Sequence, residues 1–128
     1  MATVSKETAS QVMAVDGYEG RTQDLGGYTV AYETFTSDQD PAPLFVGLPD
    51  DHCQCPHWGT VVKGALTYRY TDGTSETAMA GEAYYARPGH LPLFTPGTET
   101  IEFSPTDGLA ETMAVIGKNL EAMAAAEA

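Results

Sequence analysis

The chain has 128 residues, with 18 acidic side chains against six basic ones and a formal net charge of −12. That length allows one domain with a modest core, and 42% hydrophobic residues indicate a globular chain rather than a disordered one. Because the few cations are scattered, the sequence argues against nucleic acid or an anionic membrane surface as a partner.

The first residues carry no sorting signal. Residues 1–15 lack an apolar signal core, and no run of about 18 apolar residues occurs, so neither export nor membrane insertion is indicated. The expected compartment is the cytoplasm, where Cys53 and Cys55 stay reduced; their spacing is also too short for an ordinary disulfide. Residues 1–10 are predicted to be disordered, and residues 11–15 to form an edge strand.

Turn signals divide the middle of the chain into runs of strand length. The predicted strands, rich in Thr, Val, Tyr and Phe, cover residues 28–35, 60–70, 74–79, 83–86, 91–95 and 98–103. Alternation running into Asp72-Gly73 predicts a hairpin with a type I′ turn. This many short strands within residues 11–104 predict an all-β domain, either a sandwich or a barrel.

The hydrophobic period changes after residue 104. Apolar side chains then recur at helical spacing, as Leu109, Met113, Ile116, Leu120 and Met123. Ser104 or Thr106 can cap such a helix, and Pro105 suits its first turn. Residues 105–128 are therefore predicted to form a C-terminal amphipathic helix and tail that packs on the barrel or on a second subunit.

Residues 52–58 (His-Cys-Gln-Cys-Pro-His-Trp) gather two of the three histidines, both cysteines and the only tryptophan. Imidazole and thiolate are the ligands that hold zinc, iron, copper or nickel. We expect a divalent transition metal (Zn, Fe, Cu, Ni or Mn) to be bound among His52, Cys53, Cys55, His57 and, from a neighbouring strand, His90.

Residues 49–103 resemble a small single-domain cupin. A ligand-bearing strand leads into Val61-Val62-Lys63-Gly64, a hairpin follows, and a second motif runs from Gly81-Glu82 to Pro88-Gly89-His90. In that comparison His57 stands where the family has a glutamate, and His90 lies two residues before the usual histidine position, which is Pro92 here. The resemblance implies a double-stranded β-helix (jelly-roll) barrel, and it implies a homodimer, because small cupins commonly pair through barrel faces.

Two ligand sets are compatible with the sequence. If residues 53–57 are extended, Cys53, Cys55 and His57 share one face, and His90 can complete four ligands. The resemblance instead favours His52 with His57, which requires a bulge that Pro56 makes plausible.

Aromatic side chains are expected to line a small-molecule pocket. Trp58, Tyr68 and Tyr85 are the candidate lining residues, and Arg87 could bind a carboxylate there. By spacing alone, no recognisable acid/base pair is formed by Glu76, Glu82, Glu99 and Glu102.

Three functions follow from these observations. The first is a metal-dependent small-molecule enzyme of the oxygenase or isomerase type, whose metal acts as a Lewis acid or activates oxygen. The second is a non-catalytic module that binds a small ligand or senses metal or thiol status through Cys53 and Cys55. The third is a structural zinc site without chemistry.

Overall fold

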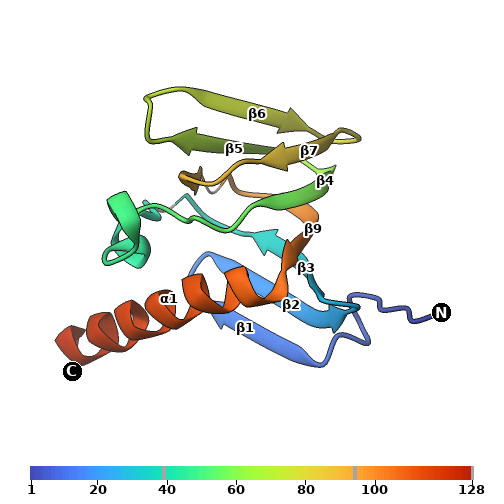
Figure 1. Ribbon diagram of the computed structural model, residues 1–128, viewed down its shortest axis with the longest axis horizontal. Helices are drawn as coiled ribbons and strands as arrows, with labels where there is room; N and C mark the ends of the chain where they lie inside the picture. Colours follow the sequence, from blue (N-terminus) through green and yellow to red (C-terminus); the bar gives the residue numbers. More distant parts are fainter. Residues whose placement is uncertain (39, 94, 128) are drawn as a thin grey trace.

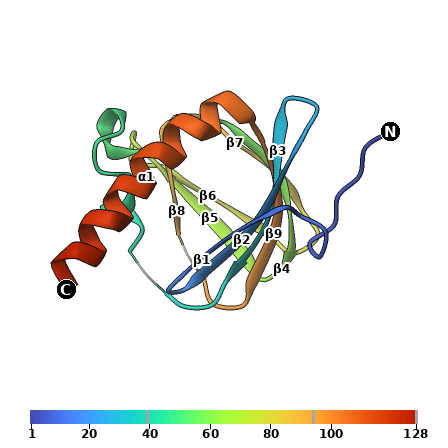
Figure 2. The same ribbon diagram turned by 90° about the horizontal axis from the view of Figure 1, so that it is seen from below.

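The computed structural model describes residues 1–38, 40–93 and 95–127. Within this part of the chain, nine strands form two antiparallel sheets that face each other and close into a barrel (Figures 1 and 2). The larger sheet has the order β1 (Gln11–Val15), β2 (Tyr18–Leu25), β3 (Tyr28–Phe35), β9 (Thr98–Pro105), β4 (His57–Lys63) and β7 (Ala83–Ala86). The smaller sheet has the order β6 (Ser75–Met79), β5 (Ala65–Tyr70) and β8 (His90–Leu93). The predicted all-β barrel is confirmed.

Two local predictions need correction. The expected strand over residues 60–70 is two strands, because the chain passes at Gly64 from the larger sheet to the smaller one. The hairpin of β5 and β6 is confirmed, but its turn is not type I′, which needs positive φ at both central residues. Here Gly73 has φ 87° while Asp72 does not have positive φ, and Gly73 N–H donates to the Tyr70 carbonyl. This is the pattern of a three-residue loop closed by a glycine bulge.

β1 occupies the edge of the larger sheet, as predicted. Its neighbour β2 was not predicted, because its sequence Tyr-Glu-Gly-Arg-Thr-Gln-Asp-Leu has few apolar residues. The preceding residues, predicted to be disordered, contact the barrel: Tyr32 Oη donates to the Val4 carbonyl at 2.9 Å, and Lys6 lies 3.4 Å from Glu99.

Helix α1 (Thr106–Glu127) starts directly after β9, so Pro105 ends the strand rather than opening the helix. Its buried face, centred on Ile116, packs with Leu109, Met113 and Leu120 against the 3₁₀ helix η1 (Ala42–Phe45), whereas Met123 is exposed. Figure 2 shows α1 running along one side of the barrel beside the segment that contains η1. No helix in the described ranges is long and apolar enough to cross a membrane.

Asn119 links α1 by hydrogen bonds to η1 and to the residue that follows η1. Its Nδ2 donates to the Leu44 carbonyl at 2.7 Å and to the Val46 carbonyl at 2.9 Å. We expect Asn119→Ala to lower the free energy of unfolding by about 1–2 kcal/mol, because two carbonyls lose their donor. Urea denaturation measures this loss, and an unchanged midpoint would show that water replaces the amide.

Candidate metal centre and buried carboxyl pair

Backbone pairing brings Cys53 next to β8. Cys53 N–H donates to the His90 carbonyl at 2.9 Å, and His90 N–H donates back to the Cys53 carbonyl at 3.1 Å. His57 is the first residue of β4 and His90 the first of β8. As a result Cys53 Sγ and one ring nitrogen of each histidine lie within 4.8 Å of one another, and all three residues are buried.

Hydrogen bonds orient the two imidazole rings. His90 Nδ1 lies 2.5 Å from the Arg87 carbonyl, which can only accept, so Nδ1 carries the proton and Nε2 is a bare lone pair. That Nε2 is buried and has no hydrogen-bond partner among the residues that the structure describes. His57 Nδ1 bonds the Ser104 hydroxyl at 2.6 Å, and His57 Nε2 lies 3.8 Å from Cys53 Sγ. Three potential ligand atoms therefore converge, with second partners of the kind that orient metal-binding histidines.

Burial sets the protonation states of these groups. It lowers the pKa of His57 to about 4 and that of His90 to about 3, so both rings are neutral near neutral pH, the form that binds metal. Burial raises the pKa of the Cys53 thiol, so without a metal the sulfur keeps its proton. A metal bound here must displace that proton, as metals do at thiolate sites.

The three groups fit a divalent transition metal. One thiolate and two imidazoles make three protein ligands, the number found in catalytic zinc sites, which leaves a fourth position open for water or substrate. The ligand atoms, now up to 4.8 Å apart, need to close to roughly 3.5 Å for tetrahedral coordination. The unpartnered His90 Nε2 is the observation that favours a ligand at this point, because buried polar atoms normally have a partner.

The other two predicted ligands lie outside this group. His52 is half-buried, and its Nδ1 bonds the Asp50 carbonyl at 2.6 Å. The Cys55 thiol is buried beside α1, with the Pro56 carbonyl 3.5 Å away, and it also lies near Gly108. Burial raises the pKa of Cys55 to about 12.

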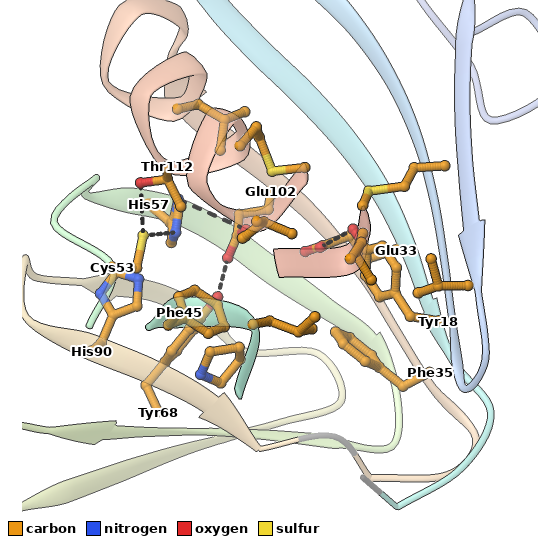
Figure 3. A pocket seen from close by; sticks show the side chains of 18 residues that line it. Tyr18, Glu33, Phe35, Phe45, Cys53, His57, Tyr68, His90, Glu102 and Thr112 are labelled. Carbon is orange, nitrogen blue, oxygen red and sulfur yellow. Dashed lines mark hydrogen bonds and ion pairs between the residues drawn. The ribbon is translucent and has the colours of Figure 1, made fainter. Parts of the chain in front are cut away.

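A pair of inward-facing glutamates adjoins the three groups. Glu33 in β3 and Glu102 in β9 are diagonal neighbours, because the register pairs Glu33 with Thr100 and Ala31 with Glu102. The two carboxyl groups are close enough to hydrogen-bond to each other. Figure 3 shows Glu102 between the Cys53, His57 and His90 group and Glu33.

Phenol groups surround the carboxyl pair. Glu102 Oε1 accepts from Tyr68 Oη at 2.6 Å and from Tyr84 Oη at 2.7 Å, while Glu33 Oε2 accepts from Tyr18 Oη at 2.5 Å. Burial, together with the neighbouring Glu102, raises the pKa of Glu33 to about 8, and burial also raises the pKa of Glu102. Near neutral pH Glu33 therefore keeps its proton.

Sequence reasoning missed this pair because it did not consider Glu33. A signal was present: in β3 the alternate positions Thr29, Ala31 and Phe35 are buried, so alternation places Glu33 on the same inward face. Its partner lies 69 positions later, and the register of β3 on β9 is not visible in either segment alone.

Both groups open into one cavity of about 110 Å³. Its polar end consists of Cys53, His57, His90 and the carboxyl pair with Tyr18 and Tyr68. Its apolar lining comes mainly from α1 and η1, through Phe45, Leu109, Met113 and Ile116. The cavity can therefore bury an apolar group while a polar group contacts the ligand atoms.

Of the predicted pocket residues, Tyr68 lines this cavity. Trp58 and Tyr85 are 42% and 51% exposed and stack on each other at 5.1 Å between ring centroids. Arg87 lies 3.6 Å above the Tyr70 ring and pairs with Asp72 at 2.9 Å. Arg87 and Tyr85 line a separate, more open hollow beside β6.

No protein-family model matches the chain, and no curated protein matches it either. Among solved structures it is similar to a protein of unknown function from Rhizobium leguminosarum, with 19% identity over 81% of this chain and 95% of that one and a TM-score of 0.57. It is also similar to ectoine synthase from P. lautus, with 9% identity over 82% of this chain and 78% of that one and a TM-score of 0.57. A domain of unknown function from Vibrio parahaemolyticus has 16% identity over 73% of this chain and 95% of that one, with a TM-score of 0.52. The antiparallel barrel, its C-terminal helix and these likenesses show that the chain is a cupin-fold protein.

Proposed function

We propose that this protein is a metal-dependent enzyme acting on a small molecule in the cavity beneath α1, with Cys53, His57 and His90 as the metal ligands. The observation that carries the proposal is the buried, unpartnered Nε2 of His90 beside the Cys53 thiol and the His57 ring. When bound, a divalent metal with an open position supplies Lewis-acid polarisation of a substrate oxygen.

The remaining side chains of the site have separate tasks. Ser104 and the Arg87 carbonyl hold the two rings through Nδ1, so that Nε2 of each ring is the atom that would bind the metal. The apolar wall from α1 and η1 excludes water from the substrate. Glu102 connects the two halves of the site, because its Oε2 lies 3.8 Å from His57 Nδ1 while its Oε1 holds Tyr68. A carboxyl pair whose pKa values are raised favours proton transfer, as in an isomerase, over an oxygenase reaction.

The non-catalytic sensing module has less support. A thiol sensor needs an accessible cysteine with a depressed pKa. Burial raises the pKa of both cysteines here, and neither side chain is exposed. The expected homodimer and cytoplasmic location stay predictions.

Elemental analysis of protein purified without a metal-affinity tag tests the metal site. We expect about one transition-metal ion per chain, and its loss in Cys53→Ser and in His57→Ala, since two remaining ligands hold a divalent ion too weakly. The matched control is Cys55→Ser, which removes the neighbouring thiol outside the group and should retain the metal.

Circular dichroism of each variant establishes that the barrel is folded. Metal retained in His57→Ala, or lost from Cys55→Ser while Cys53→Ser keeps it, would contradict the assignment. A metal-free wild-type protein that also takes up no Zn²⁺, Fe²⁺, Cu²⁺, Ni²⁺ or Mn²⁺ would overturn the proposed enzyme and favour the ligand-binding module.

A further inference from the structure

We propose that Glu33 and Glu102 bind the cationic ammonium head of a small amine whose apolar part lies against α1. The inference rests on the proposed function, because it names the substrate class of the same cavity. The juxtaposition that carries it is a buried carboxyl group, a half-buried one, aromatic side chains and apolar side chains around one cavity.

Charge balance is the first argument. In the described ranges, the arginine and lysine ion pairs involve Glu19, Asp72, Glu76 and Glu99, and no lysine or arginine pairs with Glu33 or Glu102. Glu102 is buried and Glu33 is half-buried, and two such carboxyl groups without a cation are costly unless a proton or another cation joins them. A ligand ammonium supplies that charge together with up to three N–H donors.

The hydrogen-bond pattern is the second argument. The phenols of Tyr18, Tyr68 and Tyr84 all donate to the carboxyl oxygens, so around the pair the protein offers acceptors to a ligand. Tyr18 and Tyr68 also line the cavity with their rings. Carboxylate oxygens combined with aromatic faces are the surroundings in which proteins recognise ammonium groups.

An independent observation shows that this cavity is built for a ligand. His90 is 0% exposed, lines the same space and presents the unpartnered Nε2 described above. Its ring contacts Tyr68 at 4.7 Å between centroids, and the Tyr68 hydroxyl reaches Glu102. The histidine side and the carboxylate side therefore belong to one binding site, in which a ligand can meet both.

The apolar lining of the cavity indicates the chemistry of the rest of the ligand. Leu109, Met113 and Ile116 from α1 and Phe45 from η1 line the same cavity as the carboxyl pair. A short alkyl or similarly apolar chain would bury its surface there. An anionic head would be repelled by the pair, so the ligand class is a small amine rather than a carboxylate.

Calorimetric titration with butylammonium, 1-butanol and butyrate tests the inference. These three probes share one chain and differ in the charge of the head. We expect butylammonium to bind at least about tenfold more tightly than 1-butanol, and butyrate to show no binding. Equal binding of butylammonium and 1-butanol would overturn the proposal without any variant.

Two variants locate the head group. Glu33→Gln keeps the shape and the Tyr18 hydrogen bond but can no longer give up a proton to form a carboxylate beside the ammonium, so the preference for butylammonium should fall at least about tenfold. The matched control Glu121→Gln removes one charge from an exposed position on α1 and should leave the preference unchanged. An undiminished preference in Glu33→Gln would overturn the proposal.

The metal content of each preparation separates this result from the proposed function. If the protein binds metal but shows no ammonium preference, the metal centre stands and the amine assignment is wrong. If butylammonium binding survives Glu33→Gln but disappears in Cys53→Ser, the amine binds as a metal ligand, which also contradicts the carboxylate site. An ammonium preference in a protein without metal would support the amine site and contradict the metal-dependent enzyme.

Discussion

Glu33→Gln is expected to make the metal-free protein more stable at neutral and alkaline pH. The pKa of Glu33 is raised from 4.5 to about 8 in the folded state, mainly by burial. Between these two values the folded protein binds more protons than the unfolded chain, so the wild type loses stability as pH rises through this window. The loss from one such group approaches about 1.4 kcal/mol per pH unit. Glutamine cannot ionise and keeps the Tyr18 contact, so this loss disappears.

At acidic pH the stability changes in the opposite direction, because it falls as the pH falls; we call this the acid limb of the pH profile. The pKa values of His57 and His90 are lowered from 6.5 to about 4 and about 3, so below about 6.5 the unfolded chain takes up protons first. The stability that the two neutral histidines contribute is present above the pKa of about 6.5 that they have in the unfolded chain, and it is lost as the pH falls below that value. We expect the wild type to be most stable slightly above a pH of about 6, and Glu33→Gln to lose less stability than the wild type as the pH rises beyond it.

Urea denaturation across a pH series, with a chelator present, measures both limbs. Glu121→Gln is the matched control, since it removes an exposed carboxylate, and its curve should follow the wild type. Parallel wild-type and Glu33→Gln curves would show that Glu33 is already ionised in the folded protein, contrary to its raised pKa.

Gly59→Ala is expected to be strongly destabilising. An added Cβ at this inward position of β4 would lie 2.7 Å from the Ile101 carbonyl and 2.6 Å from the Tyr84 hydroxyl. The Ile101 carbonyl belongs to the backbone of the adjacent strand and cannot move aside without opening the sheet. Tyr84 would have to leave Glu102, which it now holds at 2.7 Å. We expect a loss of about 3 kcal/mol, at the upper end for overpacking.

The control for this substitution is Gly117→Ala on α1. A Cβ there meets nothing within 4 Å, so alanine should stabilise the helix by about 0.5–1 kcal/mol. Denaturant unfolding of the two variants should therefore show effects of opposite sign. A Gly59→Ala protein within about 0.5 kcal/mol of the wild type would mean that β4 and β9 separate at little cost.

The sequence by itself determined the class of fold, because its signals are local. Alternation around Asp72-Gly73 was enough to place the hairpin, and the helical spacing from Leu109 to Leu120 was enough to place α1. The exact turn differed because several glycine-containing loops can close the same two strands. β2 was not predicted, because the difference in hydrophobicity between its two faces is small.

The sequence also indicated which chemical groups form the site, but not which of the candidate residues belong to it. Residues 52–58 supplied imidazole and thiol groups, yet several combinations of ligands were compatible with their spacing. The pairing of Cys53 with His90 across two segments of backbone brings Cys53, His57 and His90 together and leaves His52 and Cys55 outside. Only tertiary structure decides this, because a strand pairing depends on backbone groups that are the same at every residue.

The carboxyl pair depends on tertiary structure even more strongly. Glu33 and Glu102 become neighbours through the register of β3 on β9, and a slip of one residue would turn one of them to the outer face. Register is set by which faces of both strands are buried by the rest of the barrel. The sequence therefore determined which residues can carry chemistry, while the closing of the barrel decided which of them meet in one cavity.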